Sequence, residues 1–392
     1  MAGANATKAQ HEVALTIPAF YCPIDGARHP AVEAIERRCV EWIDQFQFCK
    51  TPAERTWLLA SFSADFCARF APRGNFDGLL LYAQWVYWAF AFDDAFCDEG
   101  PMSTDPGAFG IYAGQVQRAL EVSCSSEGPD NSDLVHKDPY IAALCDIGYR
   151  ARRLATPTQR RRLLDNHRRW LFGVQWQISN RAKKLTPGLD DYFGMRLGSC
   201  AGALTLGWIE IANQTEVPPA EMDLPAVQAL TEMASLVAAM DNDRHSLPKD
   251  TVLDLADQNF AIVIAQHHHL DINQALQDAI AIRDRILVRF LDLRAQVRPN
   301  ASEALGQYLD DLGHAVRGNA DWGMRVTRYH NYADRCTAPE LIYTNQHLDW
   351  AAQPADKRTD SLPYPSLRWW WDDNLVVGNV SESSPTGTNR RI

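Results

Sequence analysis

Helical periodicity along most of the chain is the feature that most constrains its fold. Apolar residues recur at the spacing of an amphipathic helix from about residue 31 to residue 333. Strand signals, meaning alternating β-branched runs closed by Asn-Gly or Asp-Gly turns, are absent from the sequence. We therefore predict an all-α protein with one helical domain. The expected helices span about 31–46, 76–94, 139–154, 157–181, 188–212, 223–246, 250–266, 271–297 and 301–333, with another between loops at 100–106 and 123–132.

The two ends of the chain have a different composition from this helical part. Pro and Gly punctuate residues 17–30, which predicts an extended arm before the first helix. After residue 350 the chain carries Pro-spaced polar residues and a Trp369–Trp371 cluster, and its last dozen residues have no apolar period. Such a segment cannot bury enough apolar surface to fold. We predict a flexible tail at 1–16, a helical domain at 17–350 and a partly disordered tail at 351–392.

Composition and charge narrow the function classes. The chain of 392 residues is 46% hydrophobic, which is enough for a large core, and its net charge of −11 would repel nucleic acid. Its nine cysteines form no CxxC pair, so neither a zinc site nor a disulfide framework is indicated. The N-terminus lacks the pattern of a secretory signal, and the most apolar run, 79–92, is too short to span a membrane. We expect a cytoplasmic protein without a membrane span.

A group of acids ends the most apolar helix. Asp94 and Asp98 are four residues apart and share a face if the helix persists, with Asp93 beside them. Carboxylates brought together disfavour each other's charge unless cations are present, and hard oxygen ligands suit Mg²⁺. The alternative is a helix end that frays into an acidic loop, although acids at a helix C-terminus are disfavoured by the macrodipole.

A second polar set follows the apolar helix before residue 241. Asn242, Ser246 and Asp250 lie at i, i+4 and i+8, which an α-helix gathers within an arc of about 80°. An amide, a hydroxyl and a carboxylate form a chelating set for a hard cation, and the nearby Lys249 can meet a phosphate. Pro248 should kink this helix near Arg244. The alternative here is a hydrophilic helix end.

Taken together, these motifs resemble those of bacterial class I terpene synthases, and the resemblance spans most of residues 20–332. Asp93-Asp94 with Asp98 is similar to the aspartate-rich motif of that family. Asn242, Ser246 and Asp250 are similar to its Asn/Ser/Glu triad, with Asp in place of the final Glu. Further similarities are Lys249, Arg196 at 46 positions before Asn242, Gly318-Asn319, Trp322 and the Arg328-Tyr329 pair.

The resemblance implies the class I terpenoid synthase fold, a helical bundle around an aromatic-lined pocket, and it implies roles for individual residues. It implies that three Mg²⁺ ions bind. The implied metal-binding residues are Asp93, Asp94, Asp98, Asn242, Ser246 and Asp250. The residues implied to bind the diphosphate are Arg196, Lys249, Arg328 and Tyr329, of which Arg196 corresponds to the family's diphosphate-sensing arginine. The residues three and four after it, Ser199 and Cys200, correspond to the family's linker and to its effector, whose carbonyl points at the substrate. The best candidates for the aromatic lining are Phe90 and Trp322.

The implied activity is ionisation and cyclisation of a linear prenyl diphosphate, with geranylgeranyl diphosphate expected as the substrate. The opening Phe20-Tyr21-Cys22-Pro23 is similar to bacterial diterpene cyclases, and small residues would leave depth for a long isoprenoid: Ala83, Ala89, Ala91, Gly198, Ala201 and Gly202. Alternatives are a sesquiterpene cyclase acting on farnesyl diphosphate, a chain-elongating prenyl transferase, which would need two aspartate-rich motifs, and a non-catalytic helical binding protein. A homodimer is left open.

Overall fold

The computed structural model describes residue 15 and residues 17–125, 138–252, 258–329 and 350–376. The described part is helical, and its single β-bridge joins Phe20 to Trp350. The α-helices are α1 (Val32–Phe46), α2 (Pro52–Leu59), α3 (Ser63–Phe70), α4 (Phe76–Phe92), α5 (Pro106–Ser125), α7 (Pro139–Leu154), α8 (Pro157–Ala182), α9 (Leu189–Ser199), α10 (Gly202–Asn213), α11 (Pro219–Met222), α12 (Pro225–Val252), α13 (Phe260–His268), α14 (Ile272–Val297), α15 (Glu303–Gly323) and α16 (Pro365–Arg368). Shorter helical turns are η1 (Asp93–Asp98), η2 (Pro101–Thr104), η4 (Arg298–Asn300), η5 (Thr327–Tyr329), η7 (Trp369–Trp371) and η8 (Asp373–Leu375).

Helix ends follow local sequence signals. At the start of α8, Thr156 and Gln159 form a reciprocal capping box, and Pro157 occupies the first turn, where its missing N–H costs nothing. At the starts of α14 and α15, the side chains of Asp271 and Ser302 accept backbone N–H groups as simple N-caps. These caps explain why the predicted starts of both helices lie within two residues of the observed ones.

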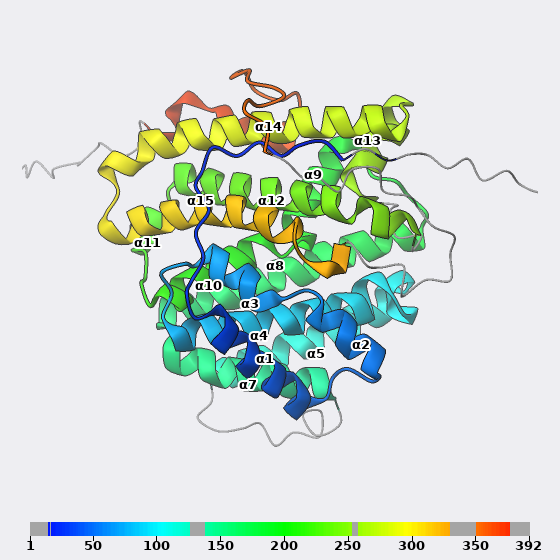
Figure 1. The fold of residues 1–392 in the computed structure, drawn as a ribbon, viewed down its shortest axis with the longest axis vertical. Coiled ribbons are helices and arrows are strands. Elements are labelled where there is room, and N and C mark those ends of the chain that lie inside the picture. The colour runs from blue at the N-terminus through cyan, green and yellow to red at the C-terminus, as the bar shows by residue number, and fades with distance from the viewer. Residues whose placement is uncertain (1–14, 16, 126–137, 253–257, 330–349, 377–392) are drawn as a thin grey trace, which may run out of the picture.

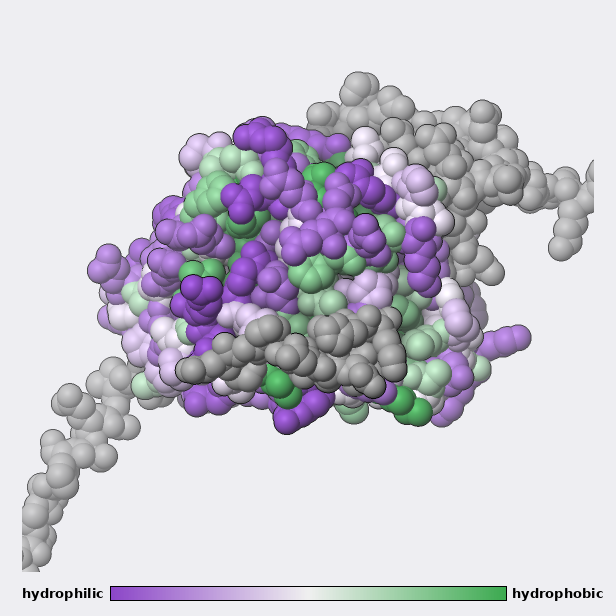
Figure 2. Space-filling view, turned by 90° about the horizontal axis from the view of Figure 1, so that it is seen from below, coloured by the Kyte–Doolittle hydropathy of each residue, from purple (hydrophilic) through white to green (hydrophobic). Residues whose placement is uncertain are grey.

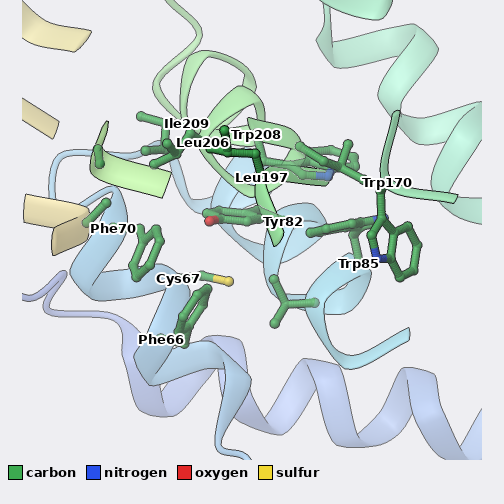
Figure 3. Close-up of a cluster of buried hydrophobic side chains, with 14 of the residues drawn as sticks. Phe66, Cys67, Phe70, Tyr82, Trp85, Trp170, Leu197, Leu206, Trp208 and Ile209 are labelled. Atoms are coloured by element: carbon green, nitrogen blue, oxygen red, sulfur yellow. The ribbon is translucent and has the colours of Figure 1, made fainter. Parts of the chain in front are cut away.

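Helix α4 lies inside the bundle, as its apolar sequence predicts. It packs against α1, α3, α7 and α10, and α12 and α15 lie on the other side of α10 (Figure 1). Figure 3 shows the core where these elements meet: Phe66, Cys67 and Phe70 from α3, Tyr82 and Trp85 from α4, Trp170 from α8, Leu197 from α9 and Leu206, Trp208 and Ile209 from α10. Large rings thus fill the centre of the bundle.

The two end segments lie against the bundle. The arm at 17–30 runs along α14 and past α15 before it enters α1 (Figure 1). Residues 350–376 pack on the domain: Trp370 is fully buried and donates to Glu232, and Tyr364 contacts Phe193 of α9. The predicted domain boundaries stay a prediction, and the expected disorder of the last dozen residues falls outside the described part.

The outer surface is polar on the side of α1 and α7. Figure 2 shows this face covered mainly by hydrophilic side chains, with apolar ones in small groups. Among the described helices, none combines the length and the apolar character that a membrane crossing requires.

Candidate active site

A cavity of about 210 Å³ lies between α3, α4, α8, α9, α10, α12 and α15. From α4 to the start of η1 its lining changes from Trp85 to Asp93, and along α12 it changes from Ala234 to Asn242. Both intervals are eight residues, which separates their ends by about 12 Å at the rise of an α-helix. The cavity therefore has an apolar end and a polar end.

The first acidic motif is not α-helical. Helix α4 passes directly into the π-helical turn η1, in which bonds join residues five apart. The Glu99 N–H donates to the Asp94 carbonyl at 3.2 Å in this way. Asp93 and Asp98, five residues apart, both line the cavity, whereas Asp94 turns to Arg328. Asp94 and Asp98 therefore do not share one α-helical face as expected. Instead, Asp93 and Asp98 are the two acids of this motif that line the cavity.

These carboxyls lie in an environment that disfavours their charge. Burial raises the pKa of the Asp93 carboxyl to about 8, and the nearby Asp98 and Asp94 carboxylates add to the shift. Burial likewise raises the pKa of Asp98. Carboxyls in such a site retain protons unless a cation compensates. A divalent cation at Asp93 and Asp98 would supply that compensation.

The second polar set keeps its helical face. Asn242, Ser246 and Asp250 all line the cavity from α12. The Ser246 hydroxyl donates to Asp250 Oδ2 at 2.5 Å, and Lys249 Nζ lies 3.0 Å from Asp250 Oδ1. Helix α12 continues through Pro248, so the proline does not interrupt the spacing that brings the three side chains together.

The oxygen donors fit a metal that is shared with a substrate. Among the described residues, no three His, Cys, Asp or Glu side chains converge as a metal cage on their own. The polar end instead combines carboxylates with the Asn242 amide and the Ser246 hydroxyl. Mg²⁺ keeps several waters and uses one or two carboxylates together with substrate phosphates. This donor set therefore fits Mg²⁺ bound next to a phosphate group.

The predicted diphosphate-binding cations all line the polar end. Arg196 forms an ion pair with Asp243, and its Nη2 lies 3.4 Å from Asn242 Oδ1. Arg328 donates two hydrogen bonds to Asp94, at 2.9 and 2.6 Å, and its side chain is 3% exposed. These contacts hold the guanidinium groups in place before any substrate enters.

Two charged residues of this site are not among those predicted from the sequence. Arg181 of α8 lines the cavity, donates to the Cys97 carbonyl at 2.8 Å and lies 3.8 Å from Asp98. Its position four residues after Gln177, which also lines the cavity, is a helical spacing that could have found it. Asp243, the partner of Arg196, accepts the Phe260 N–H at 3.0 Å. No spacing in the sequence indicates that pairing.

The helix predicted at 188–212 is two helices, which is a correction. Ala201 has a left-handed φ of 56° and separates α9 from α10. A Cβ on Gly202 would lie 1.7 Å from the Ser235 hydroxyl oxygen, so only glycine fits where α10 begins. Ser199 and Cys200 stand at this break and line the cavity. Because a helix C-terminus carries partial negative charge, the end of α9 is suited to face a cation.

Aromatic rings form the walls beyond the polar end. Phe90 and Trp322 stack with their centroids 5.9 Å apart, and Trp322 Nε1 donates to the Ser61 carbonyl at 2.7 Å. Trp85, Trp170, Phe66 and Phe70 also line the cavity, and Figure 3 shows these four rings at the junction of α3, α4 and α8. Trp88 and Phe92 of α4 lie in the core instead.

Comparison with known proteins agrees with this geometry. Residues 84–287 match the model of terpene synthase family 2, C-terminal metal binding, which is just over half of the chain. The chain belongs to this family. Spiroviolene synthase from Streptomyces violens is 44% identical over 364 residues, covering 92% of this chain and 98% of that protein. Phomopsene synthase from Allokutzneria albata is 32% identical over 366 residues, covering 93% and 99%.

The solved structures agree as well. The SVS_A2 protein from ancestral sequence reconstruction superposes with a TM-score of 0.81 at 47% identity, covering 92% of this chain and 100% of that one. The predicted fold class, the class I terpenoid synthase fold, is confirmed. The protein is a terpene synthase, a lyase that cyclises a prenyl diphosphate, and its family is one that binds metal. Membership of this family excludes two of the alternatives, a chain-elongating prenyl transferase and a non-catalytic binding protein.

Proposed function

We propose that this terpene synthase uses Mg²⁺ to ionise geranylgeranyl diphosphate and cyclises the resulting cation to a diterpene. The observation that carries the proposal is the division of one cavity into two ends. Oxygen donors and fixed cations gather at one end, and rings and small side chains line the other. A molecule with a diphosphate head and a long hydrocarbon tail matches both ends.

At the polar end, we assign the metal contacts to Asp93, Asn242, Ser246 and Asp250, and three ions are expected from the family. Bound Mg²⁺ would supply positive charge to the departing diphosphate. Asp98 faces the same space, and Asp94 holds Arg328. Among the residues assigned to the diphosphate, Arg196, Lys249 and Arg328 contribute positive charge, and Tyr329 contributes a hydroxyl hydrogen bond.

At the apolar end, the chain has to stabilise a carbocation without offering it a nucleophile. Ring faces attract cations through their quadrupole, and we assign this role to Phe90 and Trp322. Ser199 and Cys200 are assigned as linker and effector, with the Cys200 carbonyl directed at the substrate. Trp322 is buried and Phe90 is partly buried against the core, and rings packed in this way limit the water that reaches the same space.

Substrate length depends on the small residues of the lining. Of those singled out in the sequence, Ala89, Ala201 and Gly202 line the cavity. Ala83 and Ala91 are buried outside its lining, and a Cβ on Gly198 would meet the backbone of Gly173. Helix α12 adds small residues that the sequence analysis did not name: Ala234, Ser235, Ala238 and Ala239. Because these side chains are small, they leave room for a longer hydrocarbon tail, which favours the C20 substrate over the C15 substrate.

Competition between the two substrates tests the proposal. The purified enzyme would receive equal concentrations of geranylgeranyl and farnesyl diphosphate with Mg²⁺, and gas chromatography with mass spectrometry would quantify the cyclic products. Predominantly C20 hydrocarbon is expected, and none with EDTA. Predominantly C15 product would refute the substrate assignment, and full activity in EDTA would refute the role of the metal.

A further inference from the structure

The N-terminal arm, residues 17–30, is fastened to the helices that build the polar end. Arginines from three helices donate hydrogen bonds to its backbone carbonyls: Arg244 of α12 to Pro18 and Ala19 (2.7 Å to Ala19), Arg283 of α14 to Tyr21 at 2.6 Å, and Arg317 of α15 to Ile24 at 2.8 Å. In Figure 1 the arm runs across this side of the bundle before it reaches α1. No described residue of the arm lines the cavity.

Phe20 is the point at which the arm contacts the metal-binding helix. Its ring is fully buried. The Arg244 guanidinium lies 3.6 Å from the ring centroid, and the His245 ring stacks on it at 4.6 Å with an interplanar angle of 19°. Arg244 and His245 belong to the turn of α12 that follows Asn242. The arm therefore contacts this turn from outside the cavity.

The stack continues from His245 into the active site. The His245 and Tyr329 rings lie 5.8 Å apart at an interplanar angle of 14°, so the three rings are nearly parallel. A Cβ on Gly323 would lie 2.3 Å from His245 Cδ2, which shows how little room the imidazole has. At the inner end of the stack, the Tyr329 hydroxyl accepts a hydrogen bond from Asn242 Nδ2 at 2.6 Å.

We propose that Phe20, acting through His245 and Tyr329, is a positioning residue for the Asn242 amide. This inference rests on the proposed function, in which Asn242 is a metal ligand. An amide has one oxygen and one NH₂ group, so the bond from Nδ2 to Tyr329 fixes which side of the amide carries Oδ1. That oxygen has only a long contact, 3.4 Å, with Arg196 Nη2, and it is the atom that would bind the metal. Groups that orient a metal ligand control affinity for the ion without touching it.

Ring removal tests the inference. Phe20→Leu and His245→Leu keep apolar volume but remove a ring, whereas His245→Phe keeps a ring in the stack. Arg317→Gln is the matched control, because it removes a hydrogen bond to the arm carbonyl of Ile24 and leaves the three stacked rings in place. Two quantities would be measured for each variant. One is the Mg²⁺ concentration that gives half-maximal turnover of geranylgeranyl diphosphate. The other is the rise in Tm caused by Mg²⁺ with inorganic diphosphate.

We expect each Leu variant to need about tenfold more Mg²⁺ for half-maximal turnover and to show a smaller rise in Tm. His245→Phe and Arg317→Gln should stay within about threefold of the wild type, given that tenfold scale for a lost orienting contact. An unchanged Mg²⁺ requirement in folded Phe20→Leu would overturn the inference, as would an equal change in Arg317→Gln. If Phe20→Leu does not fold, His245→Leu decides. If neither the turnover nor the Tm of the wild type changes with Mg²⁺, the proposed function is overturned and this inference with it.

Discussion

Replacing Arg328 by alanine should lower both stability and turnover. The guanidinium donates two hydrogen bonds to Asp94 and is almost fully buried. Breaking a buried ion pair from one side costs about 3–5 kcal/mol, because the remaining charge loses its partner. The Asp94 side chain is 14% exposed, so water relieves part of that cost. We therefore expect the free energy of unfolding to fall by about 3 kcal/mol, the low end of this range.

The loss of turnover has a separate origin. In the proposed mechanism Arg328 places two charge-assisted hydrogen bonds on the departing diphosphate, each with a strength of about 1.5–3 kcal/mol. A loss of about 3–4 kcal/mol in the transition state lowers kcat by about 10²- to 10³-fold. Arg328→Lys keeps the charge beside Asp94 but lacks the planar fork, so it should lose little stability and still lose at least about tenfold in kcat.

Urea unfolding followed by circular dichroism would measure the stability of each variant. Single-turnover product formation at saturating substrate would measure the chemical step. A folded Arg328→Ala enzyme that retains more than a tenth of wild-type turnover would refute this reasoning. The arginine would then serve only to pack η5 against the acidic turn.

Three further predictions follow from the same geometry. Asp93→Ala and Asn242→Ala should each abolish cyclisation while the helical circular dichroism stays unchanged, and wild-type turnover in either would remove its metal assignment. Ala234→Leu adds three carbons at the apolar end, so overpacking of about 1–3 kcal/mol should raise the C15 to C20 product ratio in the competition assay, and an unchanged ratio would contradict this. Burial lowers the pKa of His167 to about 3, so the unfolded chain binds the extra proton below about pH 6.5. This group should make the fold roughly 1.4 kcal/mol less stable at pH 5.5 than at pH 7.5, a slope that His167→Gln should remove from the urea-unfolding midpoints.

Helical periodicity was sufficient to locate most of the bundle. The expected helix at 139–154 coincides with α7, and that at 157–181 is one residue shorter than α8. Both are amphipathic segments with a proline in the first turn and a capping side chain before it. Local chemistry and burial agree there, so the sequence alone locates the ends.

The breaks at the active site could not be predicted in the same way. Ala201 adopts a left-handed conformation that sequence reasoning expects of glycine or asparagine, and the contact of Gly202 with Ser235 depends on where α12 lies. The π-helical turn after α4 likewise left no local signal, yet it decides that Asp98 rather than Asp94 accompanies Asp93. Tertiary packing stabilises such irregular backbone, and the motifs report only that acids are present.

Charge pairing at the polar end explains how an acidic protein can accommodate an anionic substrate. Free carboxylates there would repel a diphosphate, and free cations buried without partners would be costly. The structure avoids the second cost, since each assigned cation already contacts an acid: Arg196 with Asp243, Lys249 with Asp250 and Arg328 with Asp94. Bound divalent ions would compensate the negative charge of the carboxylates, and the diphosphate would compensate the positive charge of the cationic side chains. The local balance of charge, rather than the net charge of −11, therefore decides what this cavity can bind.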